Sequence, residues 1–242
     1  MAKGVFVTGT DTGVGKTVVA AGLLRALRDA GMDAVPMKPV QTGVASENGR
    51  LVSSDLEFCL EVGGLSATPD DRELMCPYRF EAPCSPHLAA QIAGTPIDLK
   101  TLVDSFEKLQ AKHDAVVVEG AGGVLVPINE SETMLDLMRA LSLPVLLVGR
   151  AGLGTINHAL LSLGELRRAG LNVAGVILNS IEPVGEEFIV RSNVETIERF
   201  GEVRVLGVLE ALPVQRLHEE IARSFPHSVS GLSDVLDRLR QP

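Results

Sequence analysis

Short apolar runs rich in β-branched residues recur along the chain, and most of them are continuously apolar rather than alternating. Strands have this pattern when both faces of a parallel sheet bury them. Each run is followed by a turn and then by a helical pattern. We therefore predict strands at 5–7, 34–37, 115–118, 145–148, 173–178 and 203–206.

The segments between these runs show helical periodicity. Val19, Leu23 and Leu27 repeat every four residues, and Gly31 then provides a helix stop. A second helix is predicted over about 156–168, ending at Gly170. Strands that alternate with helices predict an α/β fold, with a doubly wound, mainly parallel sheet flanked by helices.

Residues from about 41 to 98 fit this alternation poorly. They contain helical patterns near 55–62 and 87–92, separated by a stretch that four prolines interrupt. We interpret the segment as an insertion over one edge of the sheet that covers a ligand. With this insertion, residues 1–242 are predicted to form one domain.

The composition narrows the class of protein. The 242 residues are 45% apolar and 22% charged, as in soluble globular chains, which argues against intrinsic disorder. The 22 basic and 31 acidic residues give a net charge of −9, which disfavours general binding of nucleic acid or of anionic membranes. The three cysteines lack Cys-x-x-Cys spacing, and neither a signal-peptide profile nor a run of about 18 apolar residues is seen. We expect a cytoplasmic protein.

The sharpest chemical signal is at residues 8–17, which read TGTDTGVGKT between a predicted strand and a predicted helix. This is the setting of a P-loop, in which Gly13 and Gly15 let backbone amides turn toward phosphate oxygens. Lys16 would reach the terminal phosphates, and the Thr17 hydroxyl can ligate Mg²⁺. Thr10 stands where the strict pattern has its first glycine. We predict a P-loop NTPase-like fold that binds a nucleoside triphosphate.

The residue at position 11 separates classes of P-loop protein. Partition-type ATPases carry a second lysine early in the loop, where this chain has Asp11. A nucleotide switch of the partition type is therefore disfavoured, although it stays as an alternative from another functional class. Asp11 and Thr12 indicate polar contacts beside the phosphates.

Charged residues end two of the predicted strands. Glu119 follows the run at 115–118 and precedes the glycine-rich segment 120–123, where P-loop enzymes place a metal-binding carboxylate. Lys38 follows the run at 34–37. Ligands of open α/β sheets bind at the carboxyl ends of the strands, so Lys16 and Lys38 could form a local positive cleft suited to phosphoryl transfer.

Three further segments allow two interpretations each. Asp55 either caps the helix that begins there or supplies a second metal carboxylate. Asn179, at the end of the strand at 173–178, either reads a base edge or forms an Asx turn. The helix that begins near Asn157 either uses that residue or Thr155 as a cap, or holds a carboxylate at its free amides. The histidines and cysteines show no metal-ligand or nucleophile spacing.

Taken together, these motifs resemble the dethiobiotin synthetase family. The resemblance rests on the phosphate loop and on the segments that read KPVQTG (38–43), PYRF (77–80), SPH (85–87), VEGAGG (118–123) and LGTINH (153–158), and it extends from residue 5 to about 210. It implies an ATP-dependent ligase of biotin biosynthesis that carboxylates 7,8-diaminopelargonic acid with CO₂ and closes the ureido ring. A carbamate and a carbamic–phosphoric anhydride are the implied intermediates.

The resemblance also implies roles for particular residues. Lys16 and Lys38 would be catalytic, with Lys38 stabilising the carbamate and the transferring phosphoryl group. Thr17, Asp55 and Glu119 would hold Mg²⁺. Family members are homodimers, so Asn157 is expected to serve the neighbouring subunit's site, and Thr12 and Thr42 are expected to contact the diamine. The residues expected to bind ATP are Gly13, Val14, Gly15, Lys16, Thr17, Val18, Asp55, Glu119, Gly120, Ala121, Gly122, Asn179 and Ser180.

One position departs from the family pattern. Many members of the family have proline where this chain has Glu210, so no contact with adenine is assigned to residues 209–211. A P-loop enzyme of the cobyrinate amidase type is a further alternative, although such chains are longer and carry a glutaminase domain.

Overall fold

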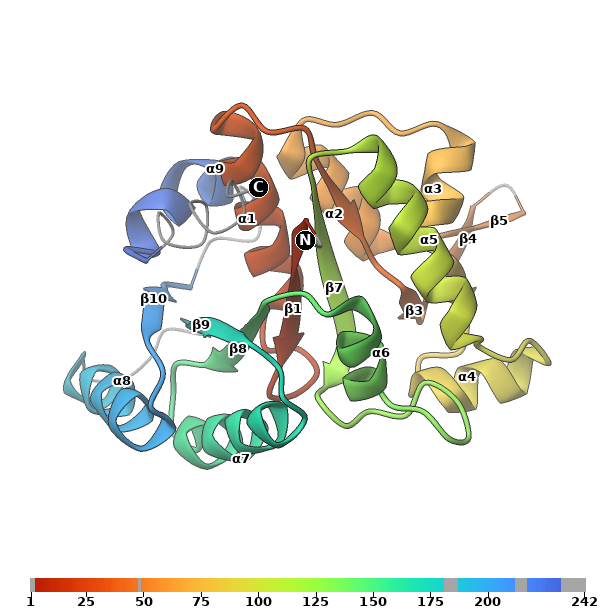
Figure 1. The fold of residues 1–242 in the computed structure, drawn as a ribbon. Coiled ribbons are helices and arrows are strands. Elements are labelled where there is room, and N and C mark those ends of the chain that lie inside the picture. Colours follow the sequence, from red (N-terminus) through yellow and green to blue (C-terminus); the bar gives the residue numbers. More distant parts are fainter. Residues whose placement is uncertain (1–2, 48, 181–186, 212–216, 232–242) are drawn as a thin grey trace.

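The computed structural model describes residues 3–47, 49–180, 187–211 and 217–231 of the chain. Strands and helices alternate over most of this length (Figure 1). The strands are β1 (Gly4–Gly9), β2 (Ala34–Met37), β3 (Val40–Thr42), β4 (Ala45–Glu47), β5 (Arg50–Val52), β6 (Tyr78–Phe80), β7 (Ala115–Gly123), β8 (Val145–Arg150), β9 (Val173–Asn179) and β10 (Val205–Leu209). The helices are α1 (Lys16–Asp29), α2 (Ser54–Gly63), α3 (Pro69–Met75), α4 (Pro86–Ala93), α5 (Leu99–Lys112), α6 (Met134–Leu141), α7 (Thr155–Arg168), α8 (Glu187–Gly201) and α9 (Leu217–Ser228).

The central sheet has six strands in the order β10-β9-β8-β1-β7-β2. All of its pairings are parallel. The strand arrows of β1 and β7 point down in Figure 1, so the carboxyl edge of the sheet lies at the bottom of that view. The predicted α/β class with a parallel, helix-flanked sheet is confirmed.

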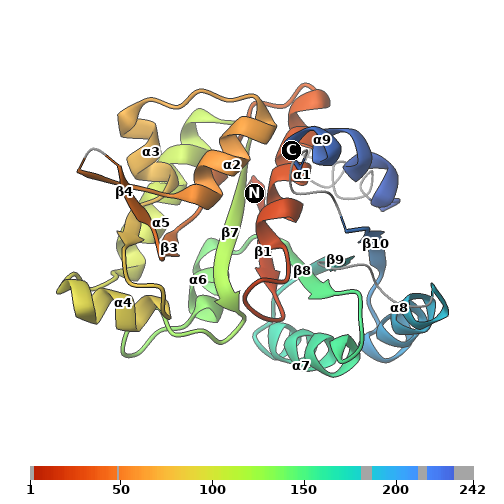
Figure 2. The same cartoon turned by 180° about the vertical axis from the view of Figure 1, so that it is seen from behind.

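Alternation along the strands explains why they are apolar throughout. In β1, Val5 and Val7 pack into a core with α1, α2 and α9. Phe6 points the other way, into a core with α5 and α6. In β7, Val117 shares the first core and Val118 the second. Figures 1 and 2 show helices on both faces of the sheet. Because both faces are covered, neither can carry the polar residues that would produce an alternating sequence.

The two helices that the periodicity predicts are confirmed. Helix α1 ends at Asp29, and Gly31 takes the left-handed conformation, with φ of 84°, in the turn that follows. Helix α7 covers 155–168, one residue more than the predicted span, and Gly170 again has a positive φ, of 75°. Glycine adopts this backbone conformation without the steric cost that a Cβ brings.

Of the six predicted strands, only the one at 34–37 has the predicted bounds; β1, β8 and β9 extend one or two residues beyond theirs, and β7 and β10 differ more. The strand predicted at 115–118 continues as β7 through Glu119 and the glycine-rich segment to Gly123, which pairs with Gly9. Glycine is required at two of these positions, because a Cβ at Gly120 would lie 2.9 Å from the Phe6 Cε1, and a Cβ at Gly122, where φ is 65°, would lie 2.6 Å from the Val126 Cγ2. Strand β10 covers 205–209 instead of 203–206 and continues past Gly207, where the Ser228 carbonyl oxygen lies 2.2 Å from the position of a Cβ. Gly207 thus marks a close approach of another backbone segment.

The segment 41–98 follows β2, the edge strand of the central sheet. The predicted helices near 55–62 and 87–92 are confirmed as α2 and α4. The sequence pattern missed α3 and four strands of three residues each, because such short runs carry no readable periodicity. Of these strands, β3 pairs with β6 in a separate parallel sheet, and β4 pairs with β5 as an antiparallel hairpin.

Over the described ranges, no helix is at once long enough and apolar enough to span a bilayer. The three cysteines are all free thiols. The fold therefore depends on its apolar cores and on the polar contacts described below.

We predict that Phe225 anchors α9 to the rest of the protein. Its side chain is 2% exposed, and its ring occupies the space over Gly22 of α1, where a Cβ would lie 2.3 Å from ring atom Cδ2. The Phe225→Ala variant should lose about 3–5 kcal/mol of unfolding free energy in urea. Phe188 of α8 is 56% exposed, and Phe188→Ala should change the unfolding free energy by about 0.5 kcal/mol or less. Equal losses in the two variants would contradict this packing.

Candidate nucleotide and metal site

The phosphate loop connects β1 to α1 at the carboxyl edge of the sheet (Figure 1). Gly13 and Gly15 have positive φ values, of 70° and 95°, and Gly15 is the residue before the first turn of α1. Lys16 is only 6% exposed, and its Nζ donates a hydrogen bond of 2.8 Å to the Asp11 carbonyl oxygen. The loop thus curls around its own lysine, as a phosphate-binding loop requires.

Asn179 braces this loop from the end of β9. Its Nδ2 donates a 3.1 Å hydrogen bond to the Val14 carbonyl oxygen, across 165 residues of sequence. A Cβ at Gly15 would lie 2.1 Å from the same Nδ2. The side chain therefore packs against the loop as well as bonding to it. Contact of Asn179 with adenine, and the contribution of the neighbouring Ser180, stay predictions.

Strand alternation places Glu119 and Lys38 on the same side of the sheet. Ala115 and Val117 pack toward α1, and Glu119 continues this series. Ala34 of β2 also packs toward α1, and Lys38 follows it at an even spacing, just beyond the strand. Because β2 and β7 are neighbours, the two charged side chains meet. The Lys38 Nζ lies 2.6 Å from the Glu119 Oε1.

A carboxylate and a hydroxyl complete the cluster. The Lys38 Nζ also lies 2.6 Å from the Asp55 Oδ2 in the first turn of α2. The Thr17 Oγ1 donates a 2.9 Å hydrogen bond to the Glu119 Oε1. Lys38 is 6% exposed and Glu119 is 3% exposed. The structure therefore brings together the three predicted metal ligands and the predicted catalytic Lys38.

Burial and charge set the pKa values in this cluster. Burial alone would lower the pKa of Lys38, but the carboxylates of Glu119 and Asp55 outweigh it and raise that pKa above its ordinary value. Burial also raises the pKa of Glu119, and the attraction of Lys38 offsets only part of this effect. Burial, followed by the like charge of Lys38, lowers the pKa of Lys16 to about 8. Lys38 thus stays charged, whereas Lys16 titrates near neutral pH.

The donor set suits a hard divalent cation. Two carboxylates and a hydroxyl supply the oxygen ligands that Mg²⁺ prefers. The Glu119 Oε2 is buried and has no hydrogen-bond partner among the described residues. Buried polar atoms normally have a partner, so this oxygen is available to a bound cation. In the described ranges, no group of three or more His, Cys, Asp or Glu side chains offers another metal site.

Ser53, and not Asp55, caps α2, and the metal role of Asp55 stays a prediction. The Ser53 side chain accepts a 3.2 Å hydrogen bond from the Leu56 backbone amide, so Ser53 is the N-cap of α2. Asp55 lies inside the helix and faces Lys38, so its carboxylate is not the cap. Gln41, to which no role was assigned from the sequence, is buried beside this helix start.

The remaining predicted residues lie outside this set of contacts. The Thr12 backbone amide bonds to the Asp11 side chain at 2.7 Å, and Thr42 ends β3. Asn157 is exposed on α7. In the described structure, no hydrogen bond joins Thr42 or Asn157 to Lys38, Asp55 or Glu119. The other residues expected to bind ATP lie on or directly beside the phosphate loop and β7: Val14, Val18, Gly120, Ala121 and Gly122.

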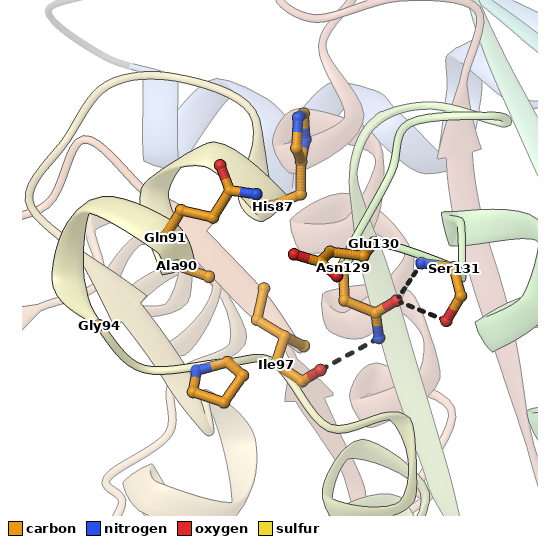
Figure 3. Close-up of a pocket in the computed structure, with 9 residues that line it drawn as sticks. His87, Ala90, Gln91, Gly94, Ile97, Asn129, Glu130 and Ser131 are labelled. Carbon is orange, nitrogen blue, oxygen red and sulfur yellow. Dashed lines mark hydrogen bonds between the residues drawn. The ribbon is translucent and has the colours of Figure 1, made fainter.

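A separate cavity of about 480 Å³ lies beside α4. Figure 3 shows Gln91 and Ala90 of α4 on one side of the cavity and the segment Asn129–Ser131 on the other, with Ile97 below them in this view. The Asn129 Nδ2 donates a 3.1 Å hydrogen bond to the Ile97 carbonyl oxygen. None of the predicted site residues lines this cavity, so we assign it no part in nucleotide binding.

We predict that Gly15 is required for the contact between the loop and Asn179. Gly15→Ala and Gly13→Ala share the cost of a side chain at positive φ, about 1–3 kcal/mol. Only the alanine at 15 would also meet the Asn179 side chain, because a Cβ at Gly13 has no neighbour within 4 Å. Gly15→Ala should therefore lose about 1–3 kcal/mol more unfolding free energy than Gly13→Ala in urea. Equal stability of the two variants would show that Asn179 moves aside freely.

Solved structures similar to this one include cell division proteins of the MinD type. The MinC–MinD cell division complex of Aquifex aeolicus has a TM-score of 0.61 at 16% identity, covering 98% of this chain and 96% of that one. The cell division ATPase MinD of Pyrococcus furiosus has a TM-score of 0.58 at 19% identity, covering 99% and 100%. At these identities the likeness establishes the fold alone.

Sequence comparisons identify the family. A family model described as an AAA domain matches residues 3–216. Proteins named ATP-dependent dethiobiotin synthetase BioD are 52% identical in Anaeromyxobacter dehalogenans, over 75% of this chain and 78% of the relative, and 36% identical in Clostridium novyi, over 93% and 94%. The relative of the same name from Methanocaldococcus jannaschii is 39% identical over 86% of this chain and 94% of its own. The chain therefore belongs to the ATP-dependent dethiobiotin synthetase family of ligases.

Proposed function

We propose that this protein joins 7,8-diaminopelargonic acid and CO₂ at the expense of ATP and releases dethiobiotin, ADP and inorganic phosphate. The observation that carries this proposal is the buried Lys38 between Glu119 and Asp55, in contact through Glu119 with Thr17 of the phosphate loop. Such an arrangement offers positive charge and exclusion of water but no protein nucleophile, as a carbamate intermediate requires. We place the reaction in the cytoplasm, on small molecules alone.

The proposed reaction has three steps. An amine nitrogen of the diamine adds to CO₂, which gives a carbamate and releases a proton. A carbamate oxygen attacks the γ-phosphorus of ATP, the bond from that phosphorus to the β–γ bridging oxygen breaks, and ADP leaves. The second amine then attacks the carbonyl carbon of the mixed anhydride, loses a proton and expels inorganic phosphate, which closes the cyclic urea.

The chain's own groups would act by binding and charge. The loop amides around Gly13 and Gly15 would hold the phosphates, with Lys16 beside the terminal one. Lys38 would stabilise the carbamate and the negative charge that moves during phosphoryl transfer. Thr12 and Thr42 would orient the diamine, because alignment of the reacting atoms supplies much of the rate in such reactions. Asn179 and Ser180 would line the adenine end of the site.

We propose Mg²⁺ as the cation that accompanies ATP. Thr17, Asp55 and Glu119 would hold it, and the buried, unpartnered Oε2 of Glu119 supports this assignment. When bound, the cation would neutralise charge on the phosphates of the nucleotide.

We also propose a homodimer in which the start of α7 in one subunit completes the site of the other. Leu153, just before α7, is 96% exposed, and Leu161 on the helix is 67% exposed. Large apolar side chains at such exposure are a feature of interaction surfaces. Asn157 and the free amides at the start of this 14-residue helix would then be available to the partner's diamine carboxylate.

ATP consumption in the presence and absence of each substrate tests the reaction. ADP should form only when both the diamine and bicarbonate are present, because the carbamate is the attacking group. The measurement is a coupled ADP assay, with mass spectrometry to identify the cyclic urea. ADP formation that needs neither compound, or that DNA or a protein partner stimulates, would overturn the proposal.

The Lys38→Met variant should lose about 10²–10³-fold in kcat because the transferring phosphoryl group loses its counter-charge. ATP binding, measured by calorimetry, should be retained, which also shows that the variant folds. Lys108 is an exposed lysine of α5, and Lys108→Met serves as the matched control with unchanged turnover. Full activity of Lys38→Met would remove Lys38 from the mechanism.

Binding of ATP should take up a proton near pH 8. The pKa of Lys16 is about 8 in the free protein, and a bound phosphate favours the charged ammonium, so the bound protein holds more protons in this range. Affinity should be highest below pH 8 and fall about tenfold per pH unit above it, until the pKa of the bound state is reached. Calorimetry at pH 8 in two buffers of different ionisation enthalpy measures the uptake, about half a proton. Lys16→Arg, which stays charged, should show none, and an equal uptake in both proteins would contradict the assignment.

A further inference from the structure

Gln41 is a buried glutamine whose side-chain amide forms hydrogen bonds with residues at the start of α2. Its side chain is only 6% exposed. The Nε2 donates a 2.8 Å hydrogen bond to the Ser54 Oγ. The Oε1 accepts one hydrogen bond from the Ser53 hydroxyl and another, of 3.3 Å, from the Asp55 backbone amide. Gln41 therefore contacts three consecutive residues at the beginning of one helix.

These contacts fix the first turn of α2. The first amides of a helix have no partner within the helix and need an acceptor from elsewhere. The Ser53 side chain supplies one, for the Leu56 amide, and Gln41 supplies another, for the Asp55 amide. Because both acceptors are held, the helix start can neither fray nor rotate freely, and the direction of the Asp55 side chain is fixed with it.

Gln41 connects the start of α2 to the chain segment that carries Lys38. Gln41 is the middle residue of β3, three residues after Lys38. The chain between β3 and α2 contains the short strands β4 and β5, so Gln41 and Ser53 lie 12 residues apart in sequence, while the apolar residues of α2 pack into both cores. The amide of Gln41 joins the two segments directly. The side chain of Asp55, whose backbone amide Gln41 holds, reaches Lys38: the Asp55 Oδ2 lies 2.6 Å from the Lys38 Nζ.

We propose that Gln41 is a positioning residue that holds the carboxylate of Asp55 in place to ligate the nucleotide's divalent cation. This inference rests on the proposed role of Asp55 as a cation ligand. Substituting residues that hydrogen-bond to a metal ligand and orient it commonly lowers the metal affinity about 10–100-fold. A helix cap without this role would change stability and leave cation affinity as it was.

The test replaces Gln41 with methionine, which has similar length and no amide. Binding of Mn²⁺ is followed by the loss of its free electron paramagnetic resonance signal, with a non-hydrolysable ATP analogue at saturating concentration. This readout needs no turnover. We expect Gln41→Met to weaken Mn²⁺ binding about tenfold or more. Binding of the analogue without metal, in EDTA, should remain unchanged. Gln91 of α4 is exposed and lies outside this cluster, so Gln91→Met should match the parent protein.

A double-mutant cycle with Asp55→Asn shows whether the two residues act as one unit. If Gln41 acts through Asp55, Gln41→Met should weaken Mn²⁺ binding no further in a chain that already carries Asp55→Asn. The inference would be overturned if the two substitutions together weakened Mn²⁺ binding by the product of their separate factors. It would also be overturned if Gln41→Met lost thermal stability but kept its Mn²⁺ affinity. Unchanged Mn²⁺ affinity in Asp55→Asn itself would refute the proposed metal role of Asp55 and this inference with it. Since Asp55→Asn is measured separately, the two failures are told apart.

Discussion

The buried carboxylate of Glu119 is the constraint around which this site is organised. A carboxylate at 3% exposure loses most of its hydration, which is tolerable only if other groups replace the water. Lys38, just beyond the end of β2, and Thr17, at the start of α1, replace the water by donating hydrogen bonds to the Glu119 Oε1. Removing one partner of such a buried pair costs about 3–5 kcal/mol. Folding of the sheet edge and assembly of the site are therefore the same event.

The lysines of the site are already paired with acceptors of the protein itself, and a bound ligand must compete with these acceptors. Asp55 and Glu119 are both paired with Lys38, and Lys16 is held by a backbone carbonyl of its own loop. The positive cleft expected from two lysines at one edge is thus largely compensated within the protein. Lys38 already contacts both carboxylates, which are the proposed cation ligands, and its ammonium has one further N–H group with which to bind another anion. Binding of the cation and stabilisation of the carbamate are for this reason expected to depend on each other.

The sequence predicts the parts of this structure whose signals are local. The apolar runs identify the strands, and the glycines and Lys16 identify the phosphate loop, because each acts within a few neighbouring residues. The pairing of Lys38 with Glu119 spans 81 residues and depends on β2 lying next to β7, an order that no local pattern specifies. The contact of Asn179 with Val14 spans 165 residues and is equally hidden. Gln41 lies in a strand of three residues, too short to show any periodicity.

The fold by itself does not select the chemistry. The MinD proteins arrange a similar sheet at 16–19% identity, so the architecture is compatible with very different sequences. This chain has Asp11 early in its phosphate loop, and the second lysine of the site is Lys38, just beyond β2. Lys38 is anchored by two carboxylates of the same chain, and so its position is set by the fold itself.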